Sequence, residues 1–166
     1  RLRSALAEMK GQVCYAHNAP FDVAWMIADL QPERCGSVPQ EIQDVMWRDT
    51  GLLTKWLING QLAETTRFSI SLANLVKTFL PDHPDTAAFI AMKAQGFKAG
   101  ENTAYWLERG TMDVKMTYEL AMRLIQKVPA DMRAGLITEF DCIIPVSNSW
   151  INGFKINEKI LAENHS

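Results

Sequence analysis

Apolar residues recur along this chain with two periods, and the shorter period predicts two strands. Residues 12–16 and 42–47 are short strand-like runs that carry β-branched and aromatic side chains. Between them, Phe21, Trp25 and Leu30 are spaced to share one face of a helix. A strand, a crossover helix and a second strand form a parallel pair, so the pattern predicts an α/β fold.

The remaining apolar positions follow the longer, helical period. Residues 69–80 form a strong amphipathic pattern, which Pro81 ends. A further helix begins at Asn102, and Gly110 is expected to interrupt or bend it. Helices are also predicted over residues 1–10, 50–57, 86–95 and 111–127, and along the apolar face from 136 to 144.

The composition is that of an ordinary soluble protein with one sizeable core. The 166 residues are 48% hydrophobic and 22% charged, and the apolar runs are too short to span a membrane. Three cysteines without a C-x-x-C pair favour a reducing compartment, so we expect a cytoplasmic protein. The net charge of −2 argues against a pure DNA-binding module. Because the first residue is Arg1, we expect a piece of a longer reading frame.

One specific stretch follows the first predicted strand, and it runs from His17 to Asp22 as His-Asn-Ala-Pro-Phe-Asp. Asn18 tolerates turn conformations and Pro20 suits the first turn of a helix. Asp22 is therefore expected in the first helical turn, at the carboxyl end of a strand, where open α/β sheets place their sites. The simpler alternative is that Asp22 only complements the helix dipole.

A second carboxylate, Asp113, is predicted on the apolar side of the helix over residues 111–127. An uncompensated carboxylate there would be costly, so Asp113 needs hydrogen-bond donors or a cation. The alternative is that Asp113 only helps to start this helix after Gly110. A third carboxylate, Asp49, follows the second strand and is interpreted as the N-cap of the next helix.

These motifs resemble those of the DEDD-type 3′–5′ exonucleases. The run from His17 to Asp22 is similar to the second motif of that family, in which an Asn and then an Asp follow a strand. Asp113, with Thr117 four residues later, is similar to the third motif. The helix over residues 69–80 resembles the Ser-Leu-x-x-Leu helix of the same enzymes.

Beyond Pro129 the chain resembles the opening of the polymerase module of family A DNA polymerases, of the bacterial DNA polymerase I or phage type. There a helix with an early Glu, here Glu139, leads to a turn of Gly and an apolar residue, here Gly153. We therefore expect part of an exonuclease domain over residues 1–128 and the first, helical elements of a polymerase module over 129–166.

The resemblance implies a partial ribonuclease H-like fold, rich in helices, and a proofreading function in a bacterial or phage-infected cell. The family hydrolyses the 3′-terminal nucleotide of DNA with two ions, Mg²⁺ or Mn²⁺, held by four carboxylates. In this chain Asp22 and Asp113 would be the catalytic, metal-binding residues, and Tyr105 would position the attacking water. The polymerase module of the parent chain would be a partner. The residues that would contact the single-stranded 3′ end are Asn18, Phe21 and Arg109.

Two departures from the family pattern limit these expectations. The sequence contains no Asp-x-Glu, which is the first motif of the family, so we expect this chain alone to bind ions weakly and to be inactive. The family also places a Tyr or His just before its last Asp. Arg109 stands four residues before Asp113, and Tyr105 can substitute only if Gly110 reshapes the backbone.

Two other interpretations stay open at this point. One is a degenerate nuclease fold kept as a DNA-binding or structural module, for which Arg109 is the main support. The other is an unrelated helical domain that mimics the motifs. The exonuclease interpretation requires the carboxyl groups of Asp22 and Asp113 to lie within roughly 8 Å of each other. It also leaves the first strand with an unpaired edge, so we expect a homodimer through that edge or a segment that covers it.

Overall fold

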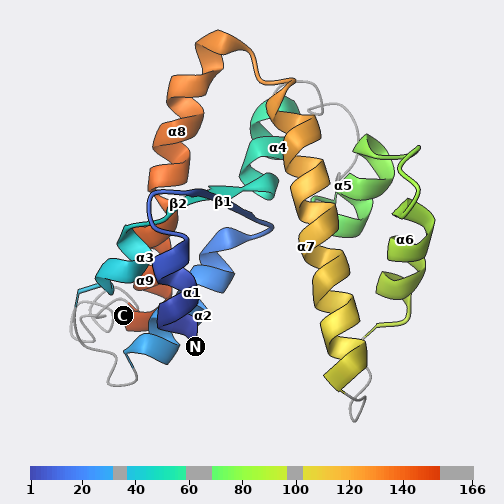
Figure 1. Cartoon of the computed structure of the whole chain (residues 1–166). Coiled ribbons are helices and arrows are strands. Elements are labelled where there is room, and N and C mark those ends of the chain that lie inside the picture. Colours follow the sequence, from blue (N-terminus) through green and yellow to red (C-terminus); the bar gives the residue numbers. More distant parts are fainter. Residues whose placement is uncertain (32–36, 59–68, 97–102, 154–166) are drawn as a thin grey trace, which may run out of the picture.

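The two strands cross the middle of the molecule, between a group of helices from the two ends of the chain and a group from its middle (Figure 1). The computed structural model describes residues 1–31, 37–58, 69–96 and 103–153. The fold is helix-rich α/β, as the sequence predicts. Its elements are α1 (Leu2–Glu8), β1 (Val13–Ala16), α2 (Ala19–Leu30), α3 (Gln40–Gln43), β2 (Met46–Asp49), α4 (Thr50–Ile58), α5 (Leu72–Phe79), α6 (Thr86–Ala94), α7 (Thr103–Ile125), the 3₁₀ turn η1 (Ala130–Met132), α8 (Arg133–Asp141) and α9 (Ile143–Asn152).

The sheet is a parallel pair, which confirms the prediction from the strand-like runs. β1 and β2 lie in register from Val13 opposite Met46 to Ala16 opposite Asp49, so both strands end together at Ala16 and Asp49. Within the described ranges, β2 is the one strand that pairs with β1. The homodimer through the other edge of β1 stays a prediction.

The second strand begins later than the pattern predicts. Ile42 lies in the short helix α3, and the strand starts only at Met46. Ile42 and Val45 are both buried, so they serve the core from a helical turn and its exit instead of from a strand. Short apolar runs cannot distinguish a strand from a buried helical turn by periodicity, which explains the error.

The expected break at Gly110 is wrong, because α7 runs unbroken from Thr103 to Ile125. A Cβ atom added at Gly110 would meet no atom within 4 Å, so this glycine lies on an open face. A single glycine costs a helix roughly 1 kcal/mol. Met116, Leu120 and Leu124, further along the same helix, are fully buried, and their burial outweighs that cost.

The described residues beyond Pro129 pack back onto the rest of the chain. The apolar face from 136 to 144 is divided between α8 and α9, which meet at Cys142. α9 packs along α2, and α8 packs on β2 and α4. Leu136, Phe140 and Ile143 thereby join the same hydrophobic core as the residues before 129. The module boundary at this position stays a prediction.

Candidate strand-end site

Asn18 forms the turn between β1 and α2. Its backbone is left-handed, with φ 66° and ψ 48°, and it is the N-cap residue of α2. Asn adopts this conformation more readily than other residues with a side chain, and Pro20 is suited to the first turn that follows. As predicted, Asp22 lies in the first turn of α2, at the carboxyl end of β1.

Asp49 ties together the starts of the two helices that leave the sheet. Its Oδ1 atom accepts a hydrogen bond of 2.8 Å from the backbone N–H of Leu52, which confirms the predicted N-cap of α4. Its Oδ2 atom accepts the backbone N–H of Ala19, the first residue of α2. The side chain is buried, and two helix N-termini stabilise its negative charge.

Gly51 leaves the space that this carboxylate needs. A Cβ atom at Gly51 would lie 2.9 Å from Oδ1 of Asp49, closer than a real Cβ atom approaches an oxygen. A side chain at this position would therefore displace the carboxylate that caps both helices.

His17 directly follows β1 and lies beside this carboxylate. Its Nδ1 atom lies 2.9 Å from the Oγ1 atom of Thr50, whose hydroxyl donates to the carbonyl oxygen of Ala16 at 3.3 Å. Burial is the largest influence on the imidazole and lowers its pKa, while the negative charges of Asp49 and Asp113 act in the opposite direction. His17 is therefore neutral at pH 7.

The pH dependence of stability is expected to report this burial. Because the pKa of His17 in the folded chain lies below its usual 6.5, the unfolded chain binds a proton more readily as the pH falls below that value. The free energy of unfolding should therefore decrease from pH 7 to pH 5, as measured by urea denaturation. His17→Gln removes the titrating group and should flatten this part of the profile. Parallel profiles for the two proteins would contradict the prediction.

Asp22 is exposed on α2 but is not fully solvated. The surrounding protein removes part of its water and raises its pKa, and the negative charge of Asp49 raises the pKa further. Asp22 thus interacts electrostatically with the carboxylate that caps its own helix.

Asp113 lies on α7, and it has a compensating cation, one of the two partners that the sequence analysis required. The Nζ atom of Lys93, in the last turn of α6, lies 2.5 Å from Oδ1 of Asp113. Both charges influence the imidazole of His17, Asp113 raising and Lys93 lowering its pKa. Asp22 and Asp113 therefore act on neighbouring groups at the strand ends. Their approach to within roughly 8 Å stays a prediction.

Arg109 and Tyr105 interact with each other on α7. The side chain of Arg109 is 7% exposed, and its Nη1 atom donates to the carbonyl oxygen of Gly96 at 2.7 Å and to Oη of Tyr105 at 3.1 Å. Since α7 is continuous, Tyr105 lies eight residues, or about 12 Å along the helix axis, from Asp113. The condition on which a water-positioning role for Tyr105 depended is therefore not met.

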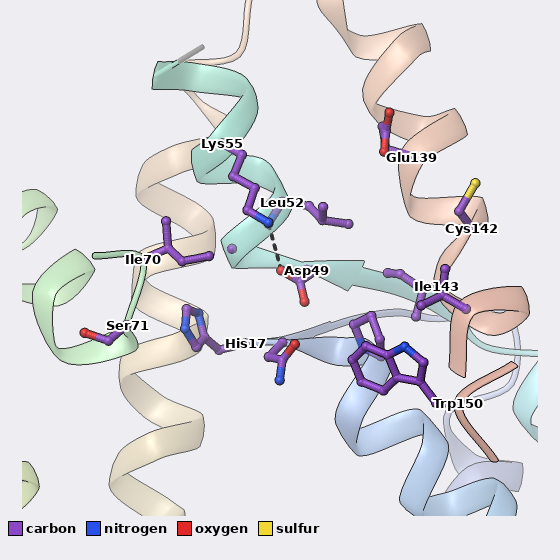
Figure 2. A pocket seen from close by; sticks show the side chains of 14 residues that line it. His17, Asp49, Leu52, Lys55, Ile70, Ser71, Glu139, Cys142, Ile143 and Trp150 are labelled. Carbon is purple, nitrogen blue, oxygen red and sulfur yellow. Dashed lines mark hydrogen bonds between the residues drawn. The ribbon is translucent and has the colours of Figure 1, made fainter. Parts of the chain in front are cut away.

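A pocket of about 440 Å³ opens at the carboxyl ends of the two strands, and we call it the strand-end pocket (Figure 2). The helices α8 and α9 supply one wall, while the strand ends, α4 and the start of α5 supply the other. Figure 2 shows Trp150 and His17 on opposite sides of this opening, with Asp49 between them. The lining residues are His17, Asn18, Pro20, Asp49, Gly51, Leu52, Lys55, Ile70, Ser71, Glu139, Cys142, Ile143, Val146 and Trp150.

Phe21 lies outside this pocket. Its ring is half exposed and meets the ring of Trp25 edge-on, with the centroids 6.3 Å apart. Both rings line a neighbouring pocket of about 290 Å³, to which Trp150 also contributes. The predicted substrate contacts are thus divided: Asn18 lines the strand-end pocket, Phe21 lies next to it, and Arg109 is held inside the protein.

The described residues do not fit a pair of divalent ions. Both oxygens of Asp49 already accept backbone N–H groups, and Asp113 is paired with Lys93. In the ranges that the structure describes, no three or more His, Cys, Asp or Glu residues are grouped so that they could hold a metal ion. Two-ion catalysis requires several carboxylates around each ion pair, so we derive no hydrolytic step from these residues.

Comparisons with known proteins identify no relative. No protein-family model matches this chain, and no curated protein or solved structure is significantly similar to it. In the described part of the chain, none of the helices is both long and apolar enough to cross a membrane.

Sequence analysis missed three side chains at the strand ends: Lys93, Lys55 and Trp150. Lys93 lies four residues after Phe89 on a predicted helix, a spacing that signals a shared face but not its contact with Asp113. Trp150 lies in the segment that resembles a polymerase module, and nothing in that pattern places it at the strand ends. None of the three is close in sequence to the motif from His17 to Asp22.

Proposed function

We propose that this chain is a fragment of a family A DNA polymerase, with part of a DEDD-type proofreading domain over residues 1–128 and the first elements of the polymerase module beyond it. In this fragment, the 3′ end of single-stranded DNA binds at the strand-end pocket, which residues of both parts line, without being hydrolysed. The observation that supports this proposal is the lining of that pocket, to which the motif residues His17 and Asn18 and the ring of Trp150 all contribute. Figure 2 shows His17 and Trp150 on opposite sides of it.

The side chains of the pocket suit a nucleotide at a strand end. A base can stack on an aromatic ring, a contact worth about 1–3 kcal/mol per base. Lys55 offers a positive charge for a phosphate, and Asn18 offers an amide that both donates and accepts. The carboxylates of Asp49 and Glu139 also line the pocket, and their negative charges repel the phosphates of the DNA backbone. Binding should therefore depend on stacking of a base.

Fluorescence anisotropy with a labelled single-stranded oligonucleotide tests this proposal. Trp150→Leu should weaken binding about 5- to 150-fold, because it removes a stacking surface. Trp25→Leu is the matched control, since Trp25 is 65% exposed and does not line the strand-end pocket. Equal affinity for the wild type and Trp150→Leu would overturn the assignment of this pocket.

The same oligonucleotide, labelled at its 3′ end, distinguishes binding from hydrolysis. Incubation with Mg²⁺ or Mn²⁺ should release no mononucleotide, because the described residues do not fit two ions. Robust release that disappears in Asp22→Ala would overturn that part of the proposal. Absence of any DNA binding would instead favour a structural module, which the internal hydrogen bonds of Arg109 also favour.

A further inference from the structure

One carboxylate oxygen of Asp113 is buried beside a compensating positive charge, while the side chain as a whole is 33% exposed. Its Oδ1 atom is shielded from solvent. The ammonium of Lys93, 2.5 Å away, is its direct polar contact. A carboxylate oxygen removed from water in this way requires a positive charge beside it.

Lys93 is held in place by its own helix. Its Nζ atom lies 5.5 Å from the ring centroid of Phe89, one turn earlier on α6, and that ring is fully buried. A cation over an aromatic face is attracted by the ring, so the ammonium is stabilised on both sides. The side chains of Lys93 and Asp113 are 25% and 33% exposed, which limits the exchange of this pair with water.

A second ion pair joins the same two helices but differs in its surroundings. Lys115 of α7 lies 2.5 Å from Oδ2 of Asp85, the N-cap residue of α6. Lys115 is 51% exposed, and neither partner influences the pKa of His17 at the strand end. The Lys93–Asp113 pair does influence His17, so of these two pairs it is the one beside the candidate site.

From these contacts we infer that Lys93 is a built-in cation that occupies the place of a metal ion at Asp113. The inference rests on the proposed function in one respect, because the exonuclease resemblance is what makes Asp113 a metal-binding position. A lysine ammonium is a compact point charge and can satisfy one carboxylate without further ligands. A divalent ion at Asp113 would have to displace it, so the lysine excludes the ion.

Thermal unfolding with added MnCl₂ tests this inference on the full chain. Lys93→Met keeps the apolar stem against Phe89 and removes the charge. The Tm of this variant should be lower than that of the wild type, and about 10 mM MnCl₂ should raise it by roughly 3 °C or more relative to NaCl of equal ionic strength. The wild type should show no such rise.

Three further variants make the result specific. Lys115→Met is the matched control, because it breaks the other α6–α7 pair and should gain nothing from Mn²⁺. The double variant Lys93→Met/Asp113→Asn should lose the Mn²⁺ response, because the negative charge of the carboxylate is gone. Lys93→Gln should respond as Lys93→Met does, and its amide can still donate to Asp113 if the methionine variant fails to fold.

Two results would overturn the inference. Equal stabilisation of the wild type and the Lys93 variants by Mn²⁺ would mean that Lys93 excludes nothing. Absence of a response in both Lys93→Met and Lys93→Gln would mean that Asp113 does not bind a divalent ion even when Lys93 is removed. These measurements contain no DNA, so their failure is independent of oligonucleotide binding at the strand-end pocket, and the two ideas can fail separately.

Discussion

Asp49→Ala is expected to lower the free energy of unfolding by about 2–4 kcal/mol. Loss of the bond to Leu52 removes the N-cap of α4, which costs about 0.5–2 kcal/mol. Loss of the bond to Ala19 leaves a backbone N–H without a partner in a buried place, which costs a further 1–3 kcal/mol. Urea denaturation of the variant and the wild type measures the sum.

Two controls separate these contributions from a general effect of removing a carboxylate. Asp49→Asn keeps one acceptor oxygen but places an NH₂ group against the other backbone N–H. Its free energy of unfolding should therefore lie between that of the wild type and that of Asp49→Ala. Asp29→Ala removes an exposed aspartate from α2 and should change stability by less than about 0.5 kcal/mol. Similar losses for Asp29→Ala and Asp49→Ala would contradict the double-cap role.

Gly135→Ala is expected to destabilise the protein, although alanine is the better helix former. A Cβ atom at Gly135 in α8 would lie 2.6 Å from Cη2 of Trp56 in α4, so the two helices must separate or the ring must move. Such overpacking costs about 1–3 kcal/mol, and helix propensity returns up to about 1 kcal/mol. The expected net loss is about 1–2 kcal/mol in chemical denaturation.

Gly110→Ala is the matched comparison, and its effect on stability is expected to have the opposite sign to that of Gly135→Ala. This glycine also lies within a helix, but nothing stands within 4 Å of the added Cβ atom. The same substitution should therefore raise the free energy of unfolding by about 0.5–1 kcal/mol. If both variants shift stability in the same direction, the close approach of α8 to Trp56 does not determine the cost.

Features that depend on neighbouring residues could be predicted from the sequence. The left-handed turn at Asn18 and the N-cap bond from Asp49 to Leu52 each involve residues at most three positions apart. The same holds for the start of α5, where Ser71 accepts the N–H of Asn74. Short-range preferences of Asn, Asp and Ser are strong enough to determine these places.

Contacts between distant residues could not be predicted in the same way. Nothing in the pattern brings Trp150 to the pocket of Asn18, or Lys93 to Asp113, because those contacts follow from how α6 and α9 pack. The prediction that Asp113 needs hydrogen-bond donors or a cation agrees with its ion pair, but it did not identify Lys93 as the partner. The bond from Arg109 to Tyr105 joins residues four apart, and recognising α7 as continuous would have predicted it.

The two hydrogen bonds of Asp49 also bear on the order in which the chain folds. One spans three residues and the other spans thirty, yet both end on the same carboxylate. The first can form as soon as α4 begins to coil, whereas the second must wait until the loop containing α2 has closed and the strands have met. A single side chain thus links the nucleation of a local helix to the completion of the sheet. Until the chain has closed on Ala19, the second oxygen of Asp49 lacks its native bond.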